Sequence, residues 1–197
     1  VGRSLGFWQA HYPRLQAIFP DQLGSHGVQA FYRAINKVQP SFIRVEADEL
    51  TYNFHIILRF ELEQAMLTGD LAVADLPTAW NDKMNELLGV VPPTDSDGCL
   101  QDVHWTRPGF GYFPTYALGN LYAAQFYETA VTQNPTIAEE MAQGQTGALV
   151  AWLRQNIHQH GRKFTPAELV QHITGGPLTH QPFMRYVTQK FSEIYEL

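Results

Sequence analysis

A long segment with an apolar repeat of three and four residues constrains the fold of this chain most. Between residues 50 and 66 the apolar positions are Leu50, Phe54, Ile57, Leu58, Leu62, Ala65 and Met66. This spacing places them on one stripe of a long α-helix. The polar positions on its other faces are Glu49, Asn53, Arg59 and Glu63. Pro40 prevents an earlier start, and Thr68, Gly69 and Asp70 end the helix.

Helical patterns also cover most of the remaining chain. We predict helices over residues 5–19, 28–38, 77–88, 114–132, 145–158 and 182–195. Thr136 and Thr165 each begin a T-x-x-E sequence, typical of the capping box that starts a helix. The glycine- and proline-rich stretch 89–111 predicts a loop, with a short extended segment or hairpin near 98–111. No repeat or linker divides the chain, so we predict a mostly α, multi-helix, single domain piece over residues 1–197.

Charge and composition disfavour several classes of protein. The net charge is −6 and no cluster of Lys and Arg stands out, so nucleic-acid binding is not expected. Cys99 is the only cysteine, which rules out a disulfide framework and a thiolate metal cage. No apolar run is long enough to cross a membrane, and the first residues lack the apolar centre of a signal peptide, so we expect a cytoplasmic protein. Charged residues make up only 16%, which suggests that further chain or a partner covers part of the surface.

Two polar clusters are candidates for chemistry. The first, residues 43–49, contains Arg44 and Asp48 at the entrance to the long helix. It is either a fork for a carboxylate, which a planar guanidinium binds with two hydrogen bonds, or a set of surface charges at a helix start. The second, residues 98–105, contains Asp102 and His104. In an extended segment they would project to one side, so that the carboxylate orients the imidazole, unless they form only a structural hydrogen bond.

Other kinds of catalytic site find little support. There is no H-E-x-x-H sequence, and His158 and His160 would point to different faces of a helix, so we assign no metal ligand within the chain. There is no G-x-S-x-G sequence and no phosphate-binding glycine pattern. Cys99 precedes His104 by five residues, but a buried thiol is the simpler interpretation.

Three segments resemble a known family. They are FIRVEADELTYNFHIILRFELE at 42–63, GCLQDVHW at 98–105 and GYFPTYALGNLYAAQ at 111–125. The first is similar to the I-R-x-x-A-D motif, and the second to the G-x-x-Q-D-x-H-W motif, of the carboxypeptidase Taq (thermostable carboxypeptidase 1) family. The resemblance implies part of a larger helical, zincin-type metallopeptidase fold that removes C-terminal amino acids from peptides and is often a homodimer.

The resemblance also implies where the metal lies. In the family Zn²⁺, which Co²⁺ can replace, is held by an H-E-x-x-H motif and a further Glu, both N-terminal to anything in this chain. We therefore expect a C-terminal part of the enzyme, truncated or proteolysed just before Val1 and inactive alone.

By resemblance, the residues present form the substrate-binding side of the site. Arg44 would bind the terminal carboxylate of the peptide, with Asp48 behind it. His104 and one tyrosine, Tyr112 or Tyr116, would donate hydrogen bonds to the carbonyl oxygen as negative charge develops.

Two further residues are assigned less directly. Asp102 would orient His104. Arg107, where the family has small residues, would either contact substrate or face solvent. Two other functions stay open. One is a non-catalytic helical module that binds peptides or proteins through the surface around 112–126, and the other is a metal-free hydrolase using Glu46, Asp48 or His104.

Overall fold

The computed structural model describes residues 1–197, and the chain divides into two compact units. The central unit is residues 37–119, and the terminal unit combines residues 1–36 with 120–197. The helix α6 (Pro114–Gln133) begins in the central unit and ends in the terminal unit. The assignment of residues 1–197 to a single domain piece stays a prediction.

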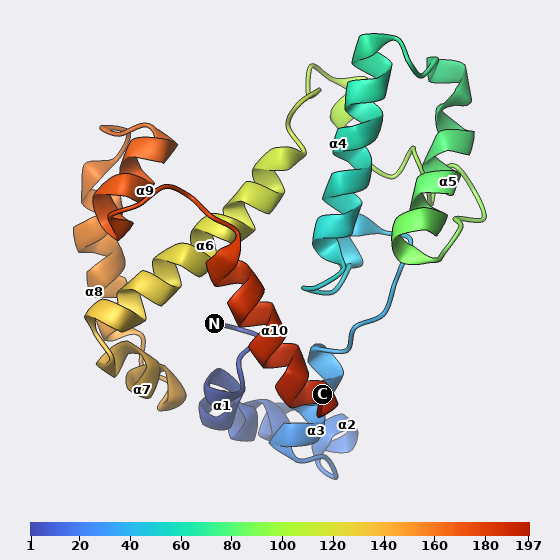
Figure 1. Cartoon of the computed structure of the whole chain (residues 1–197). Helices are drawn as coiled ribbons and strands as arrows, with labels where there is room; N and C mark the ends of the chain where they lie inside the picture. Colours follow the sequence, from blue (N-terminus) through green and yellow to red (C-terminus); the bar gives the residue numbers. More distant parts are fainter. The chain divides into compact units, whose positions relative to one another are not determined.

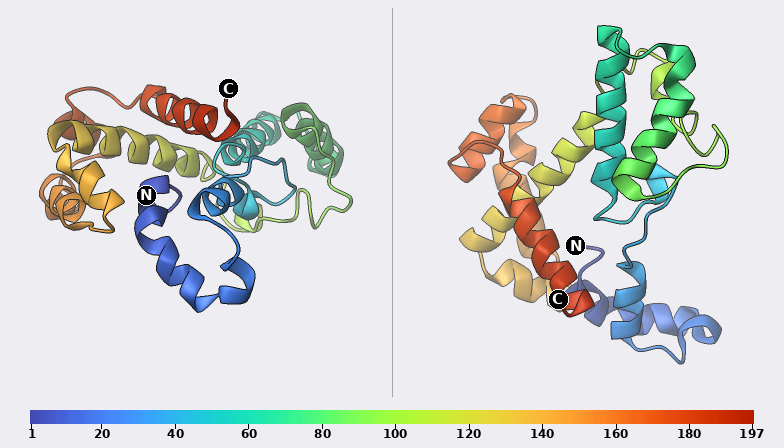
Figure 2. Two further views of the ribbon diagram at one scale, coloured as in Figure 1. Left: turned by 90° about the horizontal axis from the view of Figure 1, so that it is seen from below. Right: turned by 45° about the vertical axis from the view of Figure 1, so that its right-hand side comes forward.

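The central unit is built on two helices, α4 (Tyr52–Thr68) and α5 (Leu76–Leu88), which lie side by side (Figures 1 and 2). Three short 3-10 helices flank them: η1 (Arg44–Glu46), η2 (Val73–Asp75) and η3 (His104–Thr106). The buried core between the helices contains Leu58, Leu62, Leu76, Trp80, Met84, Leu88 and Cys99. Burial of these side chains is the main force that holds α4 against α5.

Glycine ends both long helices of the central unit. Gly69 follows α4 with φ 84°, and Gly89 follows α5 with φ 68°. Only glycine adopts this left-handed conformation without steric cost, so the chain turns away from each helix at these positions. The predicted end of the long helix at residues 68–70 is therefore confirmed.

The terminal unit consists of helices packed around a second core. Its elements are α1 (Leu5–Ile18), α2 (Pro20–Leu23), α3 (Val28–Ile35), the end of α6, α7 (Thr136–Ala142), α8 (Gly147–Asn156), η4 (His158–His160), α9 (Pro166–Thr174) and α10 (Gln181–Tyr195). Within this unit α1 packs against α3 and α7, and α7 against α8. The buried core residues are Ala130, Ile137, Met141, Trp152 and Ile173.

The two predicted capping boxes have different outcomes. Thr165 and Glu168 form the reciprocal capping box at the start of α9, as predicted. At α7 the prediction of a capping box was wrong. Thr136 is already the first helical residue, and its backbone N–H donates to the side chain of Asn134. The side chain of Asn134, two residues upstream, therefore accepts from the first backbone N–H of α7, where a threonine side chain was expected to act.

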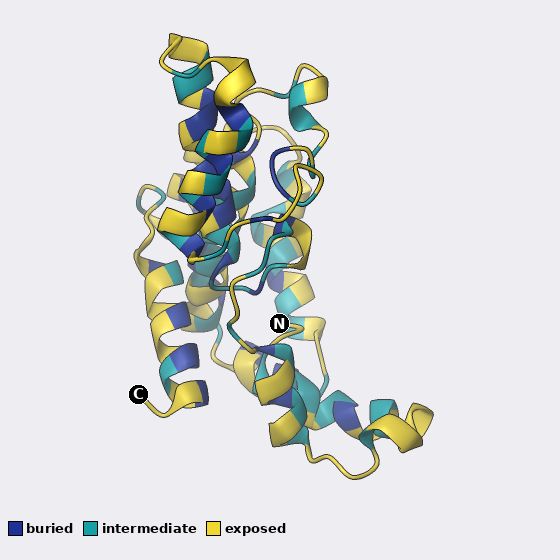
Figure 3. Cartoon of the chain, turned by 90° about the vertical axis from the view of Figure 1, so that its right-hand side faces the viewer, coloured by how far each residue is buried: buried dark blue, intermediate teal, exposed yellow.

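Mostly α architecture is confirmed, but two expectations within it were wrong. No strand or hairpin occurs at 98–111; the segment consists of turns and η3. Along α4, Arg59 and Glu63 are buried, while Phe54 and Ile57 of the predicted apolar stripe are about 40% exposed. Buried and exposed positions alternate along the helices (Figure 3). No helix has both the length and the apolar content needed to cross a bilayer.

Candidate functional site

One face of α4 is polar and yet buried. His55, Arg59 and Glu63 follow one another at intervals of four residues, so they lie on one line along the helix. None of the three is more than 2% exposed. Burying polar and charged side chains is costly unless partners satisfy them. The loop at 98–105 supplies partners to Arg59 and Glu63, whereas both ring nitrogens of His55 are buried without a hydrogen-bond partner.

Asp102 of this loop is the shared partner of two arginines. The guanidinium of Arg44 binds it as a fork: Nη2 donates to Oδ1 (2.7 Å) and Nε donates to Oδ2 (3.1 Å). Arg59 Nε donates to the same Oδ2 at 2.8 Å. Arg44 and Asp102 are 58 positions apart in sequence. The first and second polar clusters of the sequence therefore meet at one carboxylate.

The shared pairing shifts the ionisation of all three groups. Burial alone would raise the pKa of Asp102, but the hydrogen bond from Arg44 and the charge of Arg59 lower that pKa below its usual value. Burial lowers the pKa of Arg59 to about 10, against the attraction of Asp102. Burial also disfavours the charged form of Arg44, but Asp102 outweighs it and raises the pKa of Arg44. Near neutral pH all three groups are therefore charged.

Side chains fix the rest of the loop as well. Gln101 Oε1 accepts from the backbone N–H of Arg44 (2.8 Å), and Gln101 Nε2 donates to the carbonyls of Phe42 (3.0 Å) and Asp97 (2.8 Å). Trp105 Nε1 donates to Glu63 Oε1 at 2.8 Å. Because the loop has no strand partner, these bonds replace a backbone ladder in setting its position.

His104 lies among aromatic rings. Its Nε2 is hydrogen bonded to the hydroxyl of Tyr116 at 3.0 Å. Its ring centroid lies 4.3 Å from that of buried Phe113 and 5.8 Å from that of half-exposed Tyr112. Asp102 Oδ1 is 3.8 Å from Nδ1, too far for a hydrogen bond. Tyr116 is thus the direct hydrogen-bond partner of His104, and Asp102 bonds to the arginines.

Arg44 connects the Asp102 carboxylate with the aromatic rings around His104. Its Cζ lies 4.8 Å from the ring centroid of Tyr116, and its Nη1 donates to the hydroxyl of Tyr52 at 2.9 Å. Such cation–ring contacts are favourable and orient the guanidinium plane. Arg44 is 5% exposed, so the alternative of an arginine in surface pairs is wrong. The structure brings Arg44, Asp102, His104 and Tyr116 together in one unit.

Asp48 lies beside this group with a different set of contacts. Its carboxylate accepts from the backbone N–H groups of Gln39, Leu50 and Thr51, and from the hydroxyl of Thr51. These bonds fix the turn that leads into α4. Arg107, the other substrate contact suggested by the sequence, is exposed at the end of η3.

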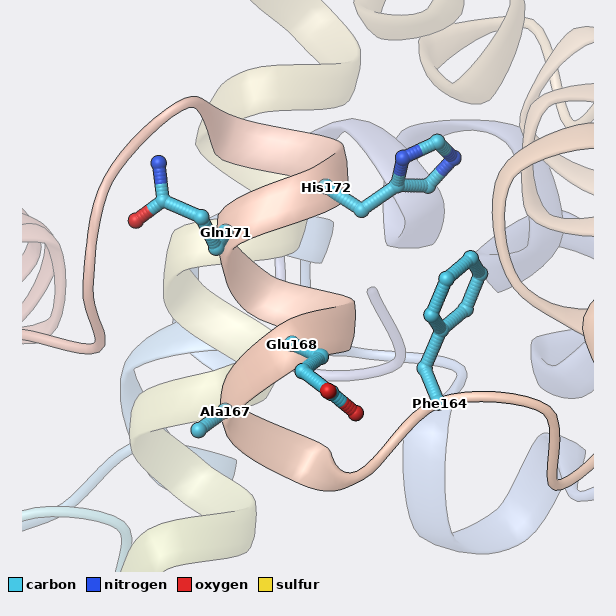
Figure 4. A pocket seen from close by; sticks show the side chains of 5 residues that line it. All are labelled: Phe164, Ala167, Glu168, Gln171 and His172. Atoms are coloured by element: carbon cyan, nitrogen blue, oxygen red, sulfur yellow. The ribbon is translucent and has the colours of Figure 1, made fainter.

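No group of three or more His, Cys, Asp or Glu side chains is placed to hold a metal ion. Cys99 is buried, and burial raises the pKa of its thiol, so it lacks the thiolate character of a nucleophile. A pocket of about 450 Å³ lies in the terminal unit, lined by Phe164, Ala167, Glu168, Gln171 and His172 (Figure 4). The rings of Phe164 and His172 lie on the same side of α9 there, and the pocket contains none of the candidate site residues.

Sequence reasoning missed Arg59, Glu63, His55 and Tyr52, all on α4. The signal for His55, Arg59 and Glu63 is the four-residue interval of polar groups in a helix whose other positions are apolar on more than one side, and Tyr52 lies outside that interval. A helix apolar over most of its surface is buried, so its few charged residues need partners in the fold.

His55 makes the stability of the central unit depend on pH. Burial, and then the charges of Arg59 and Arg44, lower its pKa to about 4, with Asp102 and Asp48 opposing the shift. The unfolded chain has a histidine pKa of about 6.5, so the two states bind protons equally above that pH. As the pH falls from about 6.5 towards 4, only the unfolded state gains the proton, and about 3 kcal/mol of stability is lost.

Urea unfolding at pH 7 and pH 4.5 measures this loss. His55→Leu, which removes the titrating group, is expected to reduce the difference between the two pH values. An equal difference in both proteins would assign the pH dependence to other groups.

The family model of the carboxypeptidase Taq (M32) metallopeptidases matches residues 1–191 of the chain. The thermostable carboxypeptidase 1 of Thermus thermophilus is 46% identical over 195 residues, which are 99% of this chain and 38% of that protein. Carboxypeptidase 1 of Bacillus subtilis is 41% identical over 197 residues, 100% of this chain and 39% of that protein. The crystal structure of the M32 carboxypeptidase from Deinococcus radiodurans superimposes with a TM-score of 0.96 at 45% identity, covering 100% of this chain and 40% of that one. The chain thus spans about two fifths of the length of these relatives.

Proposed function

The chain belongs to the carboxypeptidase Taq (M32) family of metallopeptidases, and on that premise we propose that it forms the substrate-binding part of a metallocarboxypeptidase. The observation that carries the proposal is the contact of a buried guanidinium with a histidine–tyrosine pair: Arg44 lies against the ring of Tyr116, and Tyr116 is bonded to His104. The guanidinium of Arg44 suits a terminal carboxylate, and the His104–Tyr116 pair suits the adjacent carbonyl.

The metal of the family does not fit the residues of this chain. No metal-holding group is present, and the sequence has no H-E-x-x-H motif. The proposal therefore places Zn²⁺, or Co²⁺ in its place, on residues of a longer protein outside the 197 described here. The roles proposed for the residues of this chain do not involve the metal.

Arg44 is proposed to bind the C-terminal carboxylate of the peptide. An arginine carries five N–H donors, and the bonds to Asp102 and Tyr52 use three of them. The remaining hydrogens of Nη1 and Nη2 leave donors for a second carboxylate while Asp102 stays bound. Recognition of a free carboxylate by a fixed, buried cation limits cleavage to the end of the peptide.

His104 and a tyrosine are proposed to stabilise the carbonyl oxygen as it gains negative charge. The hydrogen bond to His104 favours Tyr116 for this role, and Tyr112, half exposed next to both rings, is the alternative. Asp48 supports the start of α4 behind Arg44. Arg107 is proposed as a contact for the part of the peptide that extends towards solvent.

We further propose that the substrates of the whole protein are peptides, from which it releases C-terminal residues. It is proposed to be a cytoplasmic homodimer. Residues 1–197 alone are expected to be inactive.

Release of C-terminal amino acids from N-protected dipeptides and longer peptides tests the function. The full-length protein that contains this chain is expected to release them, to lose activity with a chelator and to regain it with Zn²⁺ or Co²⁺. The 197-residue chain is expected to release none. A full-length protein with no such activity would refute the proposal. Peptide binding by the 197-residue chain without any turnover would then favour the helical binding module.

A further inference from the structure

Arg59 is the most deeply buried charge in the central unit, at 0% exposure in the middle of α4. Its Nε donates to Asp102, and its Nη1 donates to the carbonyl of His55 at 2.8 Å. Its guanidinium also lies over two aromatic rings, 4.6 Å from the centroid of Trp80 and 5.3 Å from that of Phe113. Every face of the group is therefore in contact with the protein.

Packing alone does not account for an arginine at this position. Removing a guanidinium from water is expensive, and an apolar side chain of similar volume would fill the same space without needing a partner. Leu58, directly before Arg59, and Leu62, one turn after it, are apolar side chains that the core of the central unit buries. The arginine thus serves the carboxylate that it binds.

The two carboxylate oxygens of Asp102 accept hydrogen bonds from different numbers of arginines. Oδ1 accepts only from Arg44, whereas Oδ2 accepts from both Arg44 and Arg59. When Arg44 also binds a ligand carboxylate through the free hydrogens of Nη1 and Nη2, its charge is shared between that carboxylate and Asp102. The bond from Arg59 to Oδ2 does not involve Arg44, so it persists.

That bond matters because Asp102 precedes His104 by two residues in a loop without strands. We propose that Arg59 is a positioning residue of the carboxypeptidase site, holding Asp102, and through it the loop that carries His104, while Arg44 binds the substrate carboxylate. The inference rests on the proposed function. It adds a division of labour: Arg44 serves substrate binding, and Arg59 serves the placement of His104.

Two substitutions, Arg59→Met and Arg59→Lys, test this division. Methionine fills the volume without charge, and lysine keeps the charge without the planar fork. The matched control is Arg185→Met. Arg185 also binds a carboxylate through Nε and Nη2, that of Glu128, but it is exposed. Unfolding curves of each 197-residue variant establish that it folds.

The first readout is the nuclear magnetic resonance signal of the His104 ring in the 197-residue chain. We expect it to move in Arg59→Met, to move less in Arg59→Lys and to stay in place in Arg185→Met. The second readout is kinetic, in the full-length protein. We expect kcat to fall by about 10-fold or more in Arg59→Met, less in Arg59→Lys, with KM within about 3-fold of its original value.

Folded Arg59 variants with an unmoved His104 signal and a normal kcat would overturn the inference. So would failure of both variants to fold, because Arg59 would then be a stability residue. The ring signal does not require turnover, so it tests Arg59 even if the full-length protein proves not to be a carboxypeptidase. Conversely, a carboxypeptidase unaffected by Arg59→Met leaves the proposed function intact and removes only the role of Arg59.

Discussion

Arg44→Ala is expected to lower kcat/KM for the release of C-terminal residues by at least about 100-fold in the full-length protein. The substitution removes the only group proposed to bind the terminal carboxylate, and breaking a buried, hydrogen-bonded charge pair has effects of this size. Because the carboxylate is bound before and during the reaction, most of the loss should appear as a higher KM. Arg59 keeps its own bond to Asp102, so the loop should keep its place.

The measurement needs a charge-matched control and a conservative variant. Arg185→Ala removes an exposed arginine that pairs with Glu128, and it should leave kcat/KM unchanged. Arg44→Lys keeps the charge but loses the planar fork, so an intermediate loss is expected. Activity of Arg44→Ala close to that of the unchanged protein would show that another group recognises the carboxylate.

Asp102→Ala is expected to destabilise the chain by about 3–5 kcal/mol. The reason is that Asp102 is the carboxylate partner of two guanidinium groups. Without it, both groups stay buried with no counter-charge. Arg44 and Arg59 are 5% and 0% exposed, so neither reaches water easily. Urea unfolding followed by tryptophan fluorescence reports on this region, because Trp80 and Trp105 lie there with ring centroids 6.0 Å apart.

Glu128→Ala is the control for this loss. It removes the carboxylate of an exposed pair, whose contribution to stability is expected to be below about 1 kcal/mol. Asp102→Asn tests charge against shape, because the amide keeps one oxygen acceptor and the volume. If Asp102→Ala unfolds at the same urea concentration as Glu128→Ala, the shared carboxylate does not stabilise the central unit.

The helices could be predicted from the sequence because local signals define them. The turn residues at 68–70 and the Thr165 capping box act within a few positions of the helix end that they specify. The hairpin prediction for 98–111 failed for the opposite reason. Glycine and proline indicate that a helix is absent, but they do not say whether a strand partner exists. Here side chains from α4 and the residues around Arg44 hold the loop.

The candidate site, too, could be predicted only in part from the sequence. The family motifs identified Arg44, Asp102 and His104, and the structure brings them together with Tyr116. The sequence pattern assigns Arg59 to an outer face of α4, because a single apolar stripe accounts for the apolar residues of that helix. Its burial depends on Asp102, 43 positions away, which no local pattern records. The bond of Asp102 to two arginines, in place of His104, likewise arises only from tertiary contacts.

The sharing of Asp102 between two arginines also limits how this protein can evolve. A simple ion pair can be lost by two changes, or reversed by exchanging its members. Here one carboxylate balances two cations that come from η1 and α4, so replacing Asp102 leaves two buried guanidinium groups without a counter-charge, whereas replacing either arginine leaves Asp102 paired with the other. A path of one-residue steps that changes Asp102 first therefore passes through a destabilised intermediate. Related sequences should keep Asp102 wherever both arginines are present.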